Sequence, residues 1–201
     1  MSPNIEGKIK SPKQKSIKKS IVEDQNGKVT ELDGLYNNKP FFRKYIKEQF
    51  AKDSNELQIY KLLKRNPHPN IIEIYNINDK QYPYYIDMEL LESNLGSQDN
   101  IKQNAKQIYK HMKNALIHVH NLGIVFIDFQ WENIYYNKSN KKFVLFNFRN
   151  SGLFKKNKTG WIQDYNWINK PNSSKRFKEI QSDLPIILDM YYFNKIFFEL
   201  S

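Results

Sequence analysis

The side chains that could most clearly take part in chemistry are one carboxylate and two amides in the second half of this sequence. Asp128 precedes Asn133 by five positions, and Asn147 follows them. Carboxylate and amide oxygens are ligands for hard cations such as Mg²⁺, although an amide supplies no charge to hold the cation. Asn133 could equally bind backbone groups and order its own loop. These residue types could therefore serve a hard cation or order their own loop, and their spacing alone does not decide between the two.

The amino-acid composition excludes some other kinds of catalytic and metal site. The chain has no cysteine, which excludes thiol catalysis and cysteine-ligated zinc and fits a reducing compartment. The histidines form no convincing set of metal ligands. They are His68, His111, His118 and His120.

The length of 201 residues, 39% of them apolar and 26% charged, fits one domain or a small two-lobed body with its own core. The net charge is +11, and residues 1–20 contain six lysines and one acid. We expect this segment to be a disordered basic tail. It could serve solubility and non-specific contact with polyanions, or alternatively nuclear targeting or contact with nucleic acid.

Apolar runs stay well short of the ~18 residues of a membrane helix, and we find no secretory signal. We therefore expect an intracellular protein, cytoplasmic or nuclear, without a membrane partner.

Periodicity predicts strands mainly in the first half of the chain and helices mainly in the second. Residues 55–64 and 100–120 each carry apolar side chains on one helical face, and Pro67 ends the first helix. The predicted strands cover residues 21–22, 27–30, 42–46, 71–77, 84–91, 124–127, 133–136 and 143–146, and a last helix covers residues 184–200. This order indicates an α+β, two-lobed fold.

Five segments, in this order, resemble a eukaryotic-type protein kinase. Residues 67–72 match the turn after the regulatory helix, and residues 85–89 resemble the strand that enters the hinge. Residues 126–133 read F-I-D-F-Q-W-E-N where the family's catalytic loop reads H-R-D-L-K-P-E-N. Residues 146–149 occupy the position of the D-F-G segment, and residues 189–200 resemble the scaffold helix of the large lobe. The resemblance covers about residues 21–201 and implies a kinase-like fold.

The resemblance also implies a division of the chain. Residues 1–20 would be the tail, residues 21–91 the N-lobe, and residues 92–201 a truncated C-lobe that ends at the scaffold helix. Without later helices, the aromatic side chains of that helix would lose cover, which predicts a partner or self-association. The residues concerned are Tyr191, Tyr192, Phe197 and Phe198.

Catalytic roles follow from the resemblance alone. Asp128 stands at the carboxylate that accepts or orients the proton of the substrate hydroxyl, and Asn133 stands at the metal-binding asparagine. Alternatively, Asp128 only caps and orders its loop. Lys44 is the best candidate for the strand lysine that contacts the phosphates, with Glu56 as its partner. Lys47 remains an alternative, because the separation from Glu56 is short for the family.

Three charge-handling positions depart from the family pattern. Asn147 replaces the metal-binding aspartate, and Arg149 replaces the glycine of the same segment. Gln130 replaces the catalytic-loop lysine that would meet the transferred phosphoryl group. Arg149 could contact phosphate in place of the metal, or it could be a solvated or structural arginine. Loss of these charges together argues against efficient phosphoryl transfer.

The glycine-rich loop of the family is mostly missing. With Val29 retained at the pocket roof, Gly27 matches the last glycine, while Val22 and Asp24 stand where the first two belong. Backbone approaches phosphate most easily where no side chain intervenes, and Asp24 would add negative charge there.

The adenine pocket is altered as well. Met88 occupies the gatekeeper position and Glu89 starts the hinge. Phe42 falls where the family has a small alanine, and Tyr135 falls on the usually aliphatic floor. We expect these two large rings to leave little room for a purine.

Two further replacements concern structure and regulation. Phe126 replaces the histidine of a packed spine, and it could stack on Phe148 and Tyr60. Ile127 replaces the arginine that reads a phosphorylated activation loop, so that phosphorylation should not control this chain.

The sequence leads to three functional hypotheses. The first is a pseudokinase without a cofactor that binds a protein partner, such as a kinase, a kinase substrate or a regulator, in the way of small viral kinase relatives. The second is a slow atypical serine/threonine kinase that uses ATP and Mg²⁺. The third is a nucleic-acid-binding protein that uses the basic tail and residues 155–158.

Overall fold

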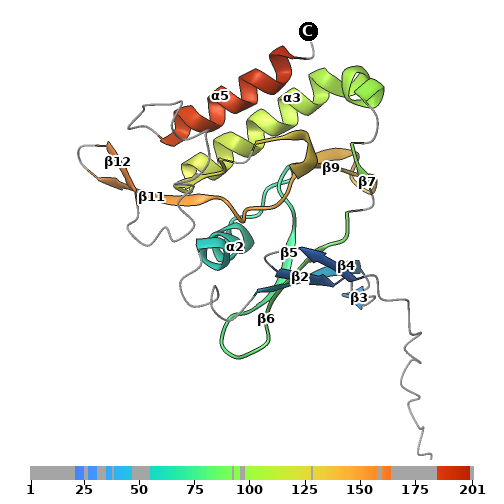
Figure 1. The fold of residues 1–201 in the computed structure, drawn as a ribbon, viewed down its shortest axis with the longest axis vertical. Coiled ribbons are helices and arrows are strands. Elements are labelled where there is room, and N and C mark those ends of the chain that lie inside the picture. The colour runs from blue at the N-terminus through green and yellow to red at the C-terminus, as the bar shows by residue number, and fades with distance from the viewer. Residues whose placement is uncertain are drawn as a thin grey trace, which may run out of the picture.

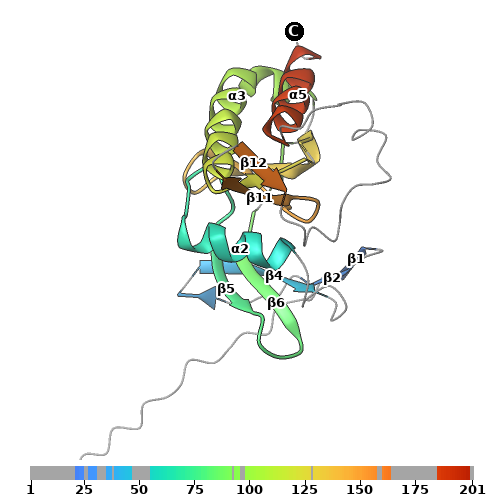
Figure 2. The same ribbon diagram turned by 90° about the vertical axis from the view of Figure 1, so that its left-hand side faces the viewer.

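The computed structural model describes residues 21–24, 27–30, 35–37, 39–46, 55–91, 93–95, 98–127, 129–157, 160–163 and 185–199. They form a strand-rich part and a helix-rich part, with one helix, α2 (Asn55–Arg65), lying between them (Figures 1 and 2). The α+β fold predicted from the sequence is confirmed. The predicted basic tail, residues 1–20, lies outside the described residues.

The strand-rich part is an antiparallel sheet with the order β1-β2-β4-β6-β5. Its strands are β1 (Ile21–Asp24), β2 (Gly27–Thr30), β4 (Lys39–Ile46), β5 (Ile74–Asn78) and β6 (Tyr84–Glu89). A short strand that was not predicted, β3 (Leu35–Tyr36), pairs with the start of β4.

Alternation along β4 directs neighbouring side chains to opposite faces of this sheet. Arg43 lies on one face, where it forms two hydrogen bonds with Asp87 and stacks over the Tyr85 ring at 3.7 Å. Lys44 lies on the other face and reaches α2. The strand thus presents one cation to the outer face and another to the interior.

Helix α2 follows the predicted amphipathic pattern. Leu57, Ile59, Tyr60 and Leu63 are buried, and Lys64 and Arg65 in the last turn suit the negative end of the helix dipole. The helix ends immediately before the Asn66–Pro67 pair, because proline cannot continue it.

The helix-rich part is built on α3 (Gln98–Asn121) and α5 (Pro185–Phe198), which lie side by side in both views (Figures 1 and 2). Tyr109 of α3 packs on Phe193 and Phe197 of α5, with ring centroids 4.8 and 5.2 Å apart. The buried stripe of α3 consists of Ile101, Ile108, Met112, Ala115, Leu116 and Val119. No helix among the described residues is long and apolar enough to cross a membrane.

Two small sheets complete this part. One has the order β10-β9-β7, from β7 (Ser93–Asn94), β9 (Ile134–Asn137) and β10 (Lys142–Leu145). The other has the order β12-β11-β8, from β8 (Ile124–Val125), β11 (Gly152–Asn157) and β12 (Gly160–Gln163). Strands β7, β11 and β12 were not predicted. A short 3-10 helix, η1 (Trp131–Asn133), precedes β9.

The expectation that four aromatic side chains of the last helix lack cover is only half right. Tyr191 and Phe198 are 45% and 82% exposed. Tyr192 is buried, and Phe197 packs on Trp131 with ring centroids 5.2 Å apart. Contacts with Tyr109 of α3 and Trp131 of η1 cover Phe197.

Candidate functional site

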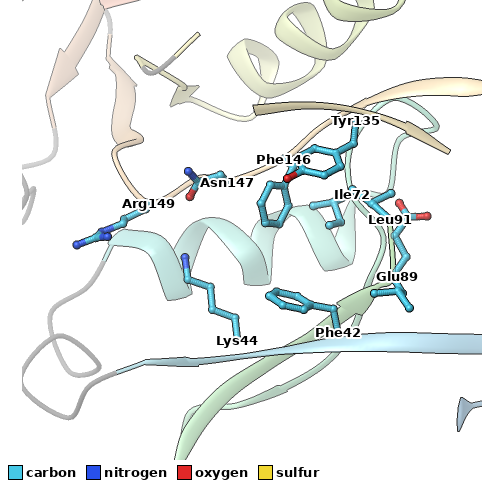
Figure 3. A pocket seen from close by; sticks show the side chains of 10 residues that line it. Phe42, Lys44, Ile72, Glu89, Leu91, Tyr135, Phe146, Asn147 and Arg149 are labelled. Carbon is cyan, nitrogen blue, oxygen red and sulfur yellow. The ribbon is translucent and has the colours of Figure 1, made fainter. Parts of the chain in front are cut away.

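A cavity of about 330 Å³ lies between the strand-rich and helix-rich parts. Strands β4, β6 and β9 contribute to it, together with residues 146–149, which follow β10. Figure 3 shows Lys44, Asn147 and Arg149 at one end and the apolar side chains Phe42, Tyr135 and Leu91 at the other. The lining residues are Phe42, Lys44, Ile72, Glu89, Leu90, Leu91, Tyr135, Phe146, Asn147 and Arg149. The cavity therefore has an apolar end and a cationic end.

Lys44 forms an ion pair with Glu56 of α2. Their side chains are only 13% and 8% exposed, so both charges lie largely out of water and depend on each other. This pair fixes α2 against the sheet and holds the Lys44 ammonium at the cavity wall. The alternative, Lys47, lies outside the described residues.

Asn147 and Asn133 contact each other at the cationic end of the cavity. The side-chain amide of Asn147 donates to Oδ1 of Asn133 at 3.1 Å. The backbone supports this arrangement, because Phe146 donates its N–H to the carbonyl of Asn133 at 2.9 Å. Asn147 has φ 67°, a left-handed conformation that asparagine tolerates better than most residues. The amide oxygen of Asn133 thus faces a hydrogen-bond donor.

At the apolar end, the two large rings Phe42 and Tyr135 both line the cavity, and the expectation that they leave little room for a purine stays a prediction. Tyr135 packs edge-on against Phe146, with centroids 5.4 Å apart, and both rings line the cavity with Phe42. They form its walls without filling it, because Tyr135 is held against its neighbour. The remaining volume lies at the lower end of the range of ligand sites, ~300–1,000 Å³.

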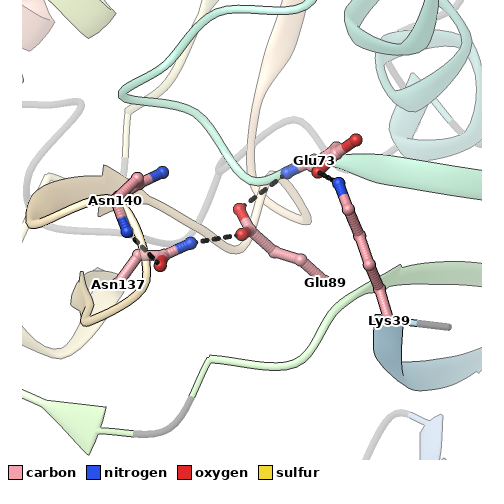
Figure 4. A network of polar contacts seen from close by, with 5 residues as sticks. All are labelled: Lys39, Glu73, Glu89, Asn137 and Asn140. Carbon is pink, nitrogen blue, oxygen red and sulfur yellow. Dashed lines mark hydrogen bonds and ion pairs between the residues drawn. The ribbon is translucent and has the colours of Figure 1, made fainter. Parts of the chain in front are cut away.

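Met88 and Glu89 lie at the end of β6. Met88 is fully buried, and it pairs with Phe42 of the neighbouring strand β4. The Glu89 carboxylate accepts from the backbone N–H of Glu73 at 2.9 Å and from the amide of Asn137 at 2.6 Å (Figure 4). Burial raises the pKa of Glu89, while the Glu73 hydrogen bond opposes the rise. The hydrogen bonds of Glu89 therefore link the residue before β5 to the last residue of β9.

A continuous stack of rings links α2 to the segments around the cavity. Phe148 packs edge-on against Tyr60 and Phe126, with ring centroids 5.9 and 5.1 Å apart, and all three are fully buried. The predicted contact of Phe126 with Phe148 is confirmed, and Tyr60 joins through Phe148. The hydroxyl of Tyr60 also accepts from the N–H of Phe148 at 3.4 Å.

Asp189 of α5 supports the end of this stack. Its fully buried carboxylate accepts from the backbone N–H of Phe126 at 2.7 Å and of Ile127 at 2.6 Å. His120 contacts the same carboxylate at 2.8 Å. Ile127 has φ 69°, which is rare for a β-branched residue, and these bonds hold it there.

The hairpin of β1 and β2 places the glycine-loop positions beside the cavity strand. Asp24 pairs with Gly27 and Val22 with Val29, and Val29 in turn pairs with Lys44 of β4. Val29 of β2 therefore lies beside Lys44 on the neighbouring strand.

A sequence model of the protein kinase domain matches residues 16–169. The chain belongs to the protein kinase family. Its strand-rich N-terminal sheet, the Lys44–Glu56 pair and the stack of rings agree with that membership.

Within this kinase fold, some of the predicted site residues line the cavity and others do not. Lys44, Phe42, Glu89, Tyr135 and Asn147 all line the cavity. Asp128 lies outside the described residues, so its catalytic role stays a prediction. The half-buried Gln130 stands before η1, where its carbonyl accepts from the N–H of Asn133 at 3.1 Å. Asn133 itself is buried and reaches the site through Asn147.

Sequence reasoning missed the partners of Glu89. Nothing in the sequence distinguishes Glu73 or Asn137 from other polar surface residues. In the structure, Asn137 begins a turn in which its Oδ1 accepts from the N–H of Ser139 at 3.0 Å and of Asn140 at 3.3 Å. This turn fixes the Asn137 side chain, which leaves its amide group to meet Glu89.

Proposed function

We propose that this member of the kinase family is a pseudokinase, which acts by binding and transfers phosphoryl groups poorly or not at all. The observation that carries the proposal is the hydrogen bond between Asn147 and Asn133. In the family, a cation held at these two positions neutralises the charge of the transferring phosphate. Here a neutral amide group occupies the Asn133 oxygen, and neither side chain supplies a negative charge.

The altered neighbours support the same proposal. Gln130 brings no positive charge to the transferred phosphate, and Arg149 adds a cation at the end of the cavity where a metal would otherwise be needed. Lys44 and Arg149 together suit an anionic group without a metal ion. A nucleotide, where one binds, would therefore place its phosphates at the cationic end and its base at the apolar end.

The partner in this proposal is a protein that recognises the kinase-like fold. It is a kinase, a kinase substrate or a kinase regulator. The exposed Tyr191 and Phe198 of α5 provide apolar surface for such a contact or for self-association.

Phosphoryl transfer from ATP to protein substrates tests the proposal directly. We expect no transfer above that of an Asp128→Ala variant. Appreciable transfer by the wild type that disappears in Asp128→Ala would overturn the pseudokinase proposal, and it would also show that Asp128 is catalytic.

Thermal unfolding with and without millimolar ATP, in Mg²⁺, in Mn²⁺ and without metal, tests the ligand. A ligand at 100 times its Kd adds about 2.7 kcal/mol of stability, which raises the melting temperature by several degrees. We expect any shift to be independent of metal and to be reduced in Arg149→Gln. A shift that requires metal would instead favour an active kinase.

A slow serine/threonine kinase is the second candidate, and the intact Lys44–Glu56 pair favours it. This candidate predicts that Asn147→Asp raises phosphoryl transfer and that Lys44→Met removes it. If Asn147→Asp leaves both nucleotide binding and transfer at zero, the second candidate is wrong.

A further inference from the structure

Helix α3 carries a row of lysines on the face that it turns away from the core. Lys102, Lys106, Lys110 and Lys113 follow one another at steps of four, four and three, and all four are exposed. Such steps place side chains on one face of a helix. At 1.5 Å per residue, the row extends over about 16 Å.

The turn between β9 and β10 adds two lysines beside this row. Gln107 of α3 donates its side-chain amide to the carbonyl of Lys141 at 3.4 Å, and Phe143 donates its N–H to Nδ1 of His111 at 3.1 Å. These bonds hold Lys141 and Lys142 against α3. We call the six residues the lysine face: Lys102, Lys106, Lys110, Lys113, Lys141 and Lys142.

Acidic side chains do not neutralise the lysine face within the described part of the chain. Asp99, in the first turn, is the only acidic residue of α3. The ion pairs found among the described side chains involve other residues. The charges also act on their surroundings, since burial and then the nearby Lys142 and Lys110 lower the pKa of His111.

We propose that the lysine face binds the phosphodiester backbone of a nucleic acid, without reading its bases. A regular row of exposed ammonium groups matches a regular row of phosphates, and neutralising the phosphates releases condensed counterions. The flanking Gln103, Gln107 and Asn114 are exposed and offer amide donors to phosphate oxygens.

The composition of the face favours nucleic acid over a protein partner. Protein interfaces draw most of their binding energy from aromatic or aliphatic anchors in well-packed pockets. Ile117 is the exposed apolar side chain that follows the row on the same side of α3, and none of the six lysines lines the cavity described above. The lysine face shares no residue with residues 1–20 or with the lining of the kinase cavity.

The test uses the full chain and a short fluorescent duplex, as DNA and as RNA, in KCl between about 50 and 200 mM. The face variant is Lys102→Gln, Lys106→Gln and Lys110→Gln combined. Its control, Lys64→Gln, Arg65→Gln and Lys80→Gln combined, removes the same charge from exposed positions of the strand-rich part and its helix. A third variant replaces the six lysines of residues 1–20 by glutamine.

We expect the slope of log K against log salt on duplex DNA to fall by about 0.9 for each lysine removed from the face. The control variant should keep the wild-type slope, and the tail variant should keep part of the binding. Loss of all binding in the tail variant, with the face variant equal to the control, would overturn the proposal. Binding of polyglutamate but of neither duplex would overturn it in favour of an acidic protein.

The ring of His111 gives a second readout that does not depend on a substitution. A bound polyanion offsets the charges of Lys110 and Lys142, so the pKa of His111 measured by NMR should rise when the duplex is added. An unchanged pKa at saturating duplex would contradict binding at this face.

Discussion

The Asn147 side chain is hydrogen-bonded to that of Asn133 at 3.1 Å, across the two positions where the family holds its cation. An amide–amide contact uses one carbonyl and one NH₂ group, whichever residue donates. The contact occupies a lone pair of the Asn133 oxygen, so a cation held at both positions would compete with it.

Asn147→Asp should make nucleotide binding depend on metal. A carboxylate supplies the negative charge that the Asn147 amide lacks, so together with Asn133 Oδ1 it can hold a cation. We expect Mn²⁺ with ATP to raise the melting temperature of Asn147→Asp but to add nothing to the wild type beyond ATP alone. Asn147→Ala is the control, because it frees Asn133 without adding a ligand. Equal metal responses in both variants would contradict the assignment.

Lys44→Met should destabilise the fold by about 3 kcal/mol, because it leaves the Glu56 carboxylate unpaired where little water reaches it. The double variant Lys44→Met/Glu56→Gln should recover part of this loss. Urea unfolding measures both. Lys61→Met is the matched control, since the Lys61–Asp79 pair has side chains 40% and 28% exposed and should contribute at most ~1 kcal/mol. Equal losses for Lys44→Met and Lys61→Met would argue against a buried pair.

Phe148→Ala should cost about 3–5 kcal/mol, because it opens a cavity in the stack between Tyr60 and Phe126. The same substitution at Phe198, which is 82% exposed, should change stability by less than about 0.5 kcal/mol. The free energies come from urea unfolding of both variants. A small effect at Phe148 would show that the stack is not packed as described.

Stability should fall as the pH drops from about 7.5 to about 5.5. Burial lowers the pKa of both His68 and His111, with nearby positive charge adding to the effect: His118 and Lys142 for His68, Lys142 and Lys110 for His111. The unfolded chain therefore binds protons more readily than the folded one below the ordinary histidine pKa, and folding loses stability there. The raised pKa of Glu89 acts in the opposite direction at lower pH, where protonation relieves its burial.

The variant His68→Asn/His111→Asn should flatten this dependence. Asparagine Oδ1 can replace Nδ1 as acceptor for the N–H groups of Asn70 and Phe143 without titrating. Urea unfolding at both pH values gives the comparison. A loss of stability on acidification as large as that of the wild type would mean that other groups are responsible.

The sequence was sufficient for the elements with a strong local pattern. The helices expected at 55–64, 100–120 and 184–200 are present as α2, α3 and α5, because the spacing of their apolar residues is a property of each segment alone. The Lys44–Glu56 pair was also predictable, since the family pattern supplies both partners. Strand β11 escaped prediction because it ends in Lys155, Lys156 and Asn157, which have low strand propensity. Strand β12 is only four residues long and pairs with β11, which in turn pairs with β8, so contacts between segments decide the structure of both strands.

The rest of the site depends on contacts between segments distant in the sequence. The orientation of Tyr135 is set by its contact with Phe146, which the size of the Tyr135 side chain alone does not predict. The Asn133–Asn147 bond likewise requires the turn at Asn147 to bring two separate segments together. Residue types indicated that both asparagines were altered parts of one site, but their mutual bond is a property of the tertiary structure.

The bonds from Asp189 to the backbone of Phe126 and Ile127 have a consequence for the order of folding. They join residues 62 and 63 positions apart, and they hold Ile127 in a conformation that it would not keep alone. A loop of that length closes late, after local helices and hairpins have formed. During synthesis, Phe126 and Ile127 therefore cannot reach their native conformation until α5 has left the ribosome. We expect pulse-labelled hydrogen exchange to protect the amides of Phe126 and Ile127 together with those of α5 and later than those of α3.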